Sequence, residues 1–101
     1  MIVYNVTTKV DHSIKAAWIQ WMKQEHIPDM KNTGCFTDAA FFEILEIDDA
    51  DGCTFTVQYF AESKGLYHQY IEKFSTGLRQ KSIEKWGDKI IAFRSLMKVV
   101  Q

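Results

Sequence analysis

The sequence contains no basic cluster, no long apolar run and only one proline, Pro28. Its formal net charge is -1, so the basic surface expected of a nucleic-acid-binding protein is missing. No run of about 18 apolar residues occurs, so we expect no membrane-spanning helix. The first residues alternate in polarity and show neither the basic nor the apolar region of a signal peptide. These absences predict a cytoplasmic protein without nucleic-acid or membrane partners.

Cysteine and histidine are also scarce. Cys35 and Cys53 fall near opposite ends of a predicted hairpin, which places them ~40 Å apart at about 3.3 Å per residue, whereas a disulfide needs Cα atoms within roughly 7 Å. We therefore expect two free thiols. The histidines and cysteines lack the spacing of metal ligands, and the acidic turn at residues 48–51 lacks the further oxygen ligands of a calcium loop. Neither a metal site nor a cofactor is predicted.

Hydrophobic and aromatic residues, by contrast, are plentiful. They make up 47 % and 14 % of the sequence, which is typical of a folded globular protein. A chain of this length can bury roughly 60 to 70 % of its unfolded surface, enough for one core without a metal or a disulfide. We expect a single domain spanning residues 1–101.

The first third of the chain predicts a strand followed by a helix. Residues 2–10 alternate between two faces, which is typical of a strand. Asp11 or Ser13 could cap the helix that follows. Pro28 lacks a backbone donor and clashes with the carbonyl group four residues earlier, so the helix should kink or end there. Residues 32–34 provide a stop signal.

The rest of the chain predicts three strands and a second helix. Residues 36–47 read as a strand, but two adjacent phenylalanines break its alternation and indicate a bulge or an edge buried on both sides. An acidic turn leads into a strand over residues 53–61. Ser63 is a candidate N-cap for a helix that extends to residues 86–87, and residues 89–100 form the last strand.

The order β-α-β-β-α-β predicts an α+β protein with a ferredoxin-like arrangement, in which a four-stranded antiparallel sheet carries both helices on one face. Alternation assigns Tyr4, Val57 and Phe93 to the helix-covered face. The other face would mix apolar side chains with hydroxyl and amide groups, which suits packing against a second copy. We therefore expect a homodimer. The residues assigned to the uncovered face are Val3, Asn5, Thr7, Thr56, Gln58, Phe60, Arg94 and Leu96.

Five short segments follow one another along nearly the whole chain: YNVT, WIQWMKQEHIP, TG-x-F, VQY and AFRSLM. Together they resemble a family of short bacterial proteins classed as domain of unknown function 4286, within the dimeric α/β-barrel superfamily. The resemblance implies that two sheets pack face to face into a barrel with the helices outside. It also implies that small ligands bind between the sheet and helices of each subunit. Members of the superfamily include antibiotic-biosynthesis and haem-degrading monooxygenases, muconolactone-type isomerases and proteins with no known activity.

His26 is the first candidate for a functional residue. It flanks the apolar stripe of the first helix near Trp21, and Pro28 frees the end of that helix from regular hydrogen bonding. Its imidazole could act as a general base or bind a ligand, or it could bond a backbone carbonyl and hold the kink. Trp21 and two tyrosines expected on the helix-covered face, Tyr4 and Tyr59, are candidate ligand-binding residues.

Asn5 and His68 form a second candidate set through the resemblance. Haem-degrading members of the superfamily use an asparagine on the first strand, a tryptophan on the third and a histidine on the second helix. Here the third strand has Tyr59 and no tryptophan, which argues against haem. Asn5, Gln58 and Arg94 could bind an anion, but pairing across a dimer is favoured. The predicted interface residues are Val3, Asn5, Gln58, Phe60 and Arg94.

Two functions remain open. The first is a small-ligand-binding or non-catalytic homodimeric module, because no complete catalytic constellation is visible. The alternative, by analogy with the superfamily, is a cofactor-independent monooxygenase or isomerase that acts on a small aromatic compound with His26 as base. A cavity of about 300 Å³ or more, reached by His26, would favour a binding protein or an enzyme over a purely structural role.

Overall fold

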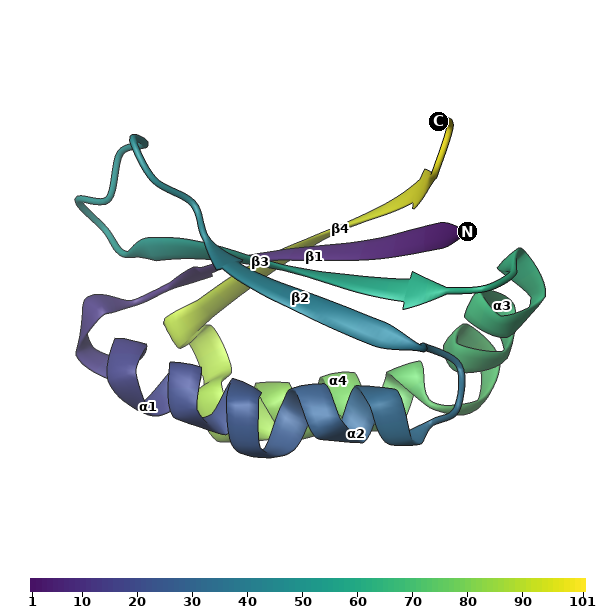
Figure 1. The fold of residues 1–101 in the computed structure, drawn as a ribbon. Helices are drawn as coiled ribbons and strands as arrows, with labels where there is room; N and C mark the ends of the chain where they lie inside the picture. Colours follow the sequence, from purple (N-terminus) through teal and green to yellow (C-terminus); the bar gives the residue numbers. More distant parts are fainter.

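The computed structural model describes residues 1–101. The protein has one four-stranded antiparallel sheet with helices on a single face (Figure 1). The strand order is β2-β3-β1-β4. The predicted α+β, ferredoxin-like arrangement is confirmed. No helix is long and apolar enough to cross a membrane. The strands are β1 (Ile2–Val10), β2 (Asp38–Glu43), β3 (Cys53–Ala61) and β4 (Ile90–Lys98).

The first helical region continues through Pro28. Asp11 caps its opening turn, and the carboxylate accepts hydrogen bonds from the backbone N–H and the hydroxyl group of Ser13 at 2.9 and 2.6 Å. Just before Pro28 the helix widens into a π turn, in which the N–H of Ile27 donates to the carbonyl group of Met22. Pro28 has no N–H to donate, and the wider π turn before it lets the helix continue without that hydrogen bond. The helix therefore does not end there. The segments are a 3-10 turn (His12–Ile14), α1 (Lys15–Trp21), the π turn (Met22–His26) and α2 (Ile27–Asn32).

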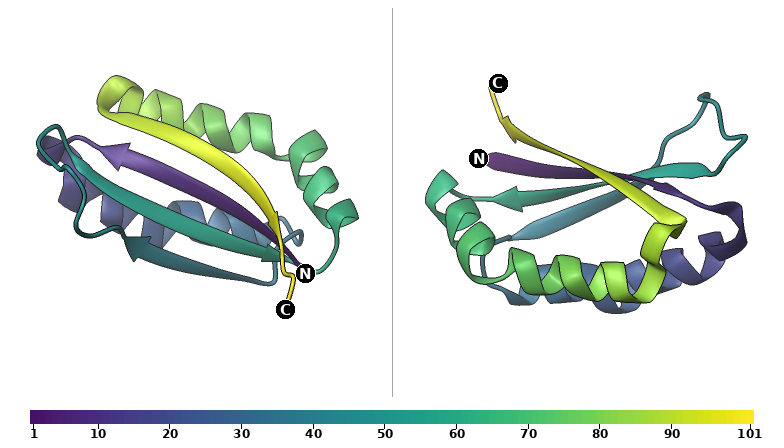
Figure 2. Two further views of the ribbon diagram at one scale, coloured as in Figure 1. Left: turned by 90° about the horizontal axis from the view of Figure 1, so that it is seen from above. Right: turned by 180° about the vertical axis from the view of Figure 1, so that it is seen from behind.

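The second helical region consists of two helices, where the sequence predicts one. Ser63 caps the first of them, and its hydroxyl oxygen accepts the N–H of Leu66 at 3.2 Å. The helix breaks at Phe74, which has φ -125° and ψ -28°, and the chain changes direction there (Figure 2). Because Phe74 is an apolar residue at helical spacing, periodicity gives no sign of the break. The segments are α3 (Lys64–Lys73), α4 (Ser75–Trp86) and a 3-10 turn (Gly87–Lys89).

The register of β4 differs from the prediction by one residue. Tyr4 on β1 faces Tyr59 on β3 and Leu96 on β4, so Leu96 lies on the helix-covered side of the sheet. Arg94, two residues earlier, also lies on that side, so the predicted place of both residues on the uncovered face is wrong. Phe93 faces away from the helices and is 65 % exposed, so its assignment to the covered face is wrong as well. The strand is apolar at both sets of alternating positions, and only its pairing with β1 fixes which set faces the helices.

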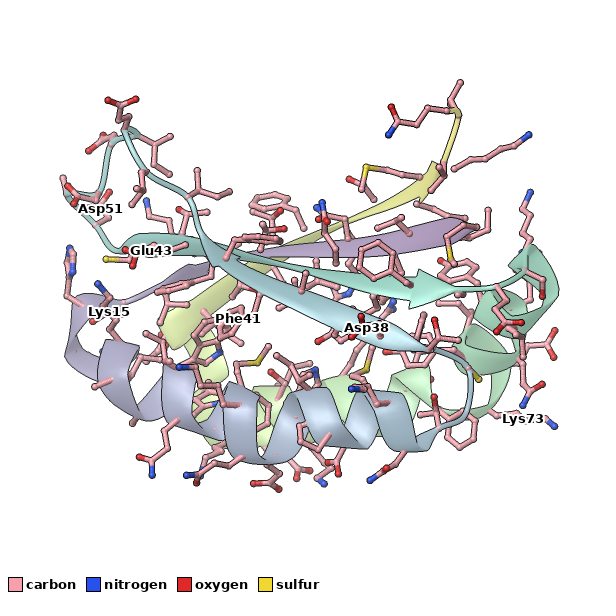
Figure 3. The ribbon with its side chains drawn as sticks, in the orientation of Figure 1. Lys15, Asp38, Phe41, Glu43, Asp51 and Lys73 are labelled. Carbon is pink, nitrogen blue, oxygen red and sulfur yellow. The ribbon has the colours of Figure 1, made fainter.

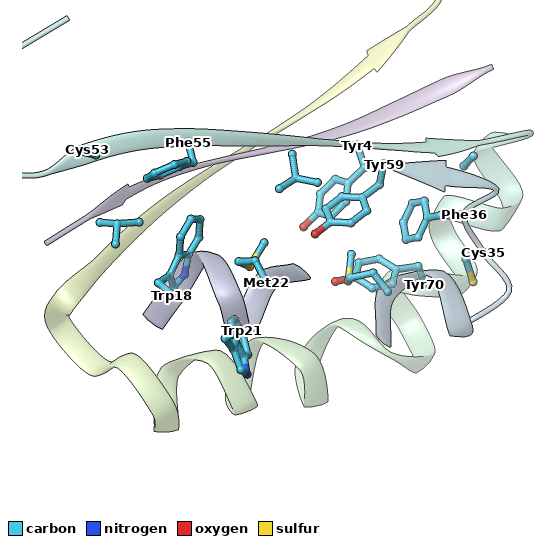
Figure 4. Packing of buried hydrophobic residues seen from close by; sticks show 14 residues of the cluster. Tyr4, Trp18, Trp21, Met22, Cys35, Phe36, Cys53, Phe55, Tyr59 and Tyr70 are labelled. Carbon is cyan, nitrogen blue, oxygen red and sulfur yellow. The ribbon is translucent and has the colours of Figure 1, made fainter. Parts of the chain in front are cut away.

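The core lies between the sheet and the helices (Figure 4). Trp18 is 2 % exposed, and its ring packs against those of Phe41 and Phe55 at centroid distances of 5.8 and 5.1 Å. β2 is an edge strand that pairs with β3 without a break, so the predicted bulge is absent. Phe41 projects from β2 towards the helices (Figure 3), whereas Phe42 is 50 % exposed on the other side. The edge is therefore buried on one side only in the single chain.

The acidic connection between β2 and β3 lies in solvent at one end of the sheet, where Figure 3 shows Asp51. It ends at Gly52, where a Cβ atom would collide with the carbonyl oxygen of Val10, so the close approach requires glycine. Cys35 and Cys53 are both buried and free, as the sequence predicts.

Candidate functional site

A cavity of about 240 Å³ lies between the sheet and the helical layer. Side chains of β1, β3 and β4 line it from the sheet, and side chains of α1, the π turn, α2, α3 and α4 line it from the helices. Ile83 on α4 and Arg94 on β4 both line it and are exposed, so the cavity opens to the surface between these two elements. Its volume is somewhat smaller than that of common ligand sites, which begin at about 300 Å³.

All four residues predicted as catalytic or ligand-binding line this cavity. Tyr4 and Tyr59 point from the sheet towards the helices (Figure 4), and Trp21 lines the cavity from α1. His26 completes the set from the last position of the π turn. The structure therefore brings together, between the first helical region and the sheet, residues from distant parts of the sequence, from Tyr4 to Tyr59.

His26 is held by its neighbour Trp21 and not by the backbone. The two rings stack with centroids 4.9 Å apart and an angle of 22° between their planes. Burial lowers the pKa of His26 to about 4, although the charge of Asp29 acts in the opposite direction. The ring is therefore neutral at neutral pH. A proton acceptor with so low a pKa is a weak general base, whereas a neutral imidazole remains a good hydrogen-bond partner.

A cluster of tyrosines forms one end of the cavity. The Tyr4 ring lies 5.5 Å from that of Tyr70 and 6.2 Å from that of Tyr59, measured between centroids. Burial raises the pKa of Tyr59 and of Tyr70, so both hydroxyl groups stay protonated. This end of the site offers neutral hydroxyl groups on an aromatic wall.

Two arginines also line the cavity, and the sequence pattern predicts neither of them there. Arg79 on α4 donates from Nη2 to the hydroxyl oxygen of Tyr4 at 3.0 Å, while its Nε is buried without a partner. Arg94 lines the opening from β4. A helical spacing could have identified Arg79, because it lies four residues after the buried Ser75 and three before Ser82, which also lines the cavity.

The second candidate set is not assembled. Asn5 lies on the uncovered face, where its Nδ2 donates to the Thr7 hydroxyl at 3.2 Å and its Oδ1 accepts from the Thr56 hydroxyl at 2.8 Å. His68 is exposed on α3, and Tyr59 faces the helices. The asparagine therefore lies on the opposite side of the sheet from the other two, and these three residues do not converge on one site.

Four of the five predicted interface residues share the uncovered face. Val3 faces Phe60, and Asn5 faces Gln58, across the β1–β3 pair. The fifth, Arg94, lies on the cavity side instead. The register of β4 adds apolar side chains to the face in its place. The exposed ones are Ile91 (57 %), Phe93 (65 %) and Met97 (39 %).

Two solved structures share this fold over nearly the whole chain. One is an ethyl tert-butyl ether (EthD) family protein from Bacillus halodurans C-125, with a TM-score of 0.72 and 12 % identity over 99 % of this chain and 100 % of that one. The other is a protein from Deinococcus radiodurans assigned to the antibiotic biosynthesis monooxygenases, with a TM-score of 0.59 and 12 % identity over 100 % of this chain and 94 % of that one. At such identities the likeness shows the fold alone.

No curated protein matches the sequence. At the level of families there is a match over residues 1–100, to the family described as Domain of unknown function (DUF4286). The chain belongs to this family.

Proposed function

We propose that the protein is a homodimeric module that binds a small molecule in the cavity between its sheet and its helices. The observation that carries the proposal is a mostly apolar cavity into which a few polar groups converge, from His26, Tyr4 and Arg79. This combination is typical of ligand sites, where apolar walls supply affinity and a few polar groups fix orientation.

The size of the cavity does not by itself exclude a purely structural role, because its volume of about 240 Å³ lies below the roughly 300 Å³ that would favour binding. Protein interiors are close-packed, and an empty cavity costs about 24 cal/mol per Å³. Water or a ligand has to offset that cost, and the apolar walls favour a ligand with an apolar part.

The test is to screen small aromatic compounds for binding to the wild type and to a variant whose cavity is filled by a larger side chain. Ala92 lines the cavity from β4, so Ala92→Leu should reduce its volume, whereas Ala16→Leu adds the same atoms on the exposed surface of the first helical region. We expect small aromatic compounds to shift the amide signals of cavity residues in the wild type and in Ala16→Leu but not in Ala92→Leu. Equal binding by both variants would place the site elsewhere.

The character of the uncovered face of the sheet supports the proposal of a homodimer. Its apolar side chains include Phe93, which is 65 % exposed, while its central polar groups Asn5, Thr7 and Thr56 already hydrogen-bond to one another. Such a face can be covered by a second copy without leaving these polar groups unpaired. Sedimentation should give a dimer that Phe93→Lys converts to a monomer. Ile83→Lys, an equivalent change on the exposed side of α4, should leave the dimer intact.

The alternative, an oxygenase or isomerase with His26 as base, receives less support. The lowered pKa of His26 makes it a poor base at neutral pH, and Asp and Glu are absent from the cavity lining. Binding is therefore the function that the arrangement favours.

A further inference from the structure

The guanidinium group of Arg79 has hydrogen-bonding capacity that the protein does not use. A guanidinium carries five N–H donors in a planar fork. The Tyr4 hydroxyl accepts one of them at 3.0 Å, and the Nε of Arg79 is buried without any acceptor. The remaining Nη donors of Arg79 have no acceptor in the chain, so a carboxylate supplied by a ligand can pair with them.

The side chains that line the cavity also carry a net positive charge. Arg79 and Arg94 both line it, neither forms an ion pair, and no carboxylate lines it. The carboxylates that act on the nearby His26 are those of Asp29 and Glu25. Both are already bound by Lys81, at 3.0 and 3.7 Å, outside the cavity. The site therefore presents two positive charges and no negative one.

We infer that the ligand of this site is a small organic anion: a carboxylate on an aromatic or otherwise apolar body, with the carboxylate bound by Arg79 and Arg94. The inference rests on the proposed binding function and specifies the chemical class of the ligand. The planar fork of arginine matches the two oxygens of a carboxylate. Deeper walls formed by Trp18, Met22 and Val57 would contact the apolar body.

The volume limits the size of that body. An apolar cavity of about 150 Å³ accommodates benzene, with six carbon atoms. In proportion, about 240 Å³ accommodates about nine or ten non-hydrogen atoms. Benzoate, with about nine, is therefore a suitable probe, and its neutral amide, benzamide, has nearly the same shape without the charge.

The experiment is a pair of titrations of the full-length protein, with benzoate and with benzamide, followed by chemical-shift changes of the cavity residues. We expect the wild type to bind benzoate at least about tenfold more tightly, a difference of about 1.4 kcal/mol. Arg79→Gln should abolish that preference while binding of benzamide stays the same. Arg94→Gln, a change at an exposed residue, should reduce the preference and provides a second variant should Arg79→Gln fail to fold.

Lys85→Gln is the matched control, because Lys85 is exposed on the same helix as Arg79 and does not line this cavity. If it lowers benzoate binding as much as Arg79→Gln does, the preference reflects overall charge and the inference is wrong. Equal binding of benzoate and benzamide by the wild type would overturn the anionic class and leave the binding function standing. Failure of the cavity to take up either probe, or any other small aromatic compound, would overturn both.

Discussion

On the helix-covered face of the sheet, Arg79 keeps a buried Nε without an acceptor, whereas on the uncovered face Asn5, Thr7 and Thr56 hydrogen-bond to one another. Both faces combine apolar side chains with polar ones, so composition does not separate them. The difference lies in whether the polar groups are paired within the chain. Paired groups suit burial against another protein surface, whereas an unpaired donor suits a ligand that brings its own acceptor.

The comparison predicts, first, that the two faces contribute very differently to the stability of the single chain. Trp18→Ala should lower the free energy of unfolding by about 3 to 5 kcal/mol, because Trp18 is 2 % exposed and packs on two aromatic rings. Phe93→Ala, at a residue that is 65 % exposed, should cost less than about 1 kcal/mol in dilute protein. Urea denaturation over a range of protein concentrations measures both. A small effect of Trp18→Ala would show that the core does not depend on this residue.

The sequence predicts the faces of β1 and β3 better than it predicts those of β4. The apolar stripe of the first helix and the alternation of β1 and β3 place Trp21, Tyr4 and Tyr59 correctly, because each pattern has one clear phase. β4 has none, so Phe93 and Arg94 were assigned to each other's faces. That error follows from the physics of a strand that is apolar at both sets of positions, where only the register with its neighbour decides.

The cavity could be predicted only in part. Helical and strand periodicity identifies residues that point inwards, but it does not show which inward space remains open. Nor does it give the break at Phe74, which sets the direction of α4 and with it the place of Arg79. Two of the polar groups central to the proposed ligand, Arg79 and Arg94, thus become visible only in three dimensions.

A second prediction concerns how the stability of the protein depends on pH through His26, which lines the cavity. His26 has a pKa of about 4 in the folded protein and an ordinary value of 6.5 when unfolded, so the unfolded chain binds more protons between those values. Stability should be complete above about pH 6.5 and should fall towards pH 4, by at most about 3 kcal/mol from this residue. The test compares unfolding free energies of the wild type and His26→Asn across this range. The variant should lack this part of the slope, and parallel curves would contradict the burial of the ring.

A third prediction addresses the uncovered face. Thr56→Val removes the hydroxyl group that donates to Asn5 at 2.8 Å and keeps the shape of the side chain. We expect a loss of about 1 to 2 kcal/mol, the usual contribution of two hydrogen bonds, because Asn5 loses a donor and the Thr7 hydroxyl loses its acceptor. Binding of benzoate should not change, since the altered group lies on the other side of the sheet from the cavity. Weaker binding would mean that the two faces are coupled.

The smallest expected effect is a change in the stability of the ligand-free protein when Arg79 is replaced. It tests the contrast between the two faces most directly. Arg79→Met keeps a long side chain and removes a charge that has no carboxylate partner together with a buried donor that has no acceptor. Desolvation of the guanidinium and its unpaired Nε oppose folding, although the hydrogen bond to Tyr4 and the neighbouring tyrosines favour the charged form and raise the pKa of Arg79. We expect the free energy of unfolding to rise by up to about 1 kcal/mol, partly offset by the lost hydrogen bond to Tyr4.

Lys85→Met on the same helix controls for the change of net charge and helix propensity, and it should leave stability nearly unchanged. A gain in stability that accompanies the loss of benzoate binding would show that Arg79 is retained for the ligand at a cost to the fold. A loss of more than about 1 kcal/mol would instead show that Arg79 is a structural residue held by the tyrosine cluster. In that case the covered face would resemble the uncovered one, with its polar groups paired within the chain, and the contrast between the two faces would no longer hold.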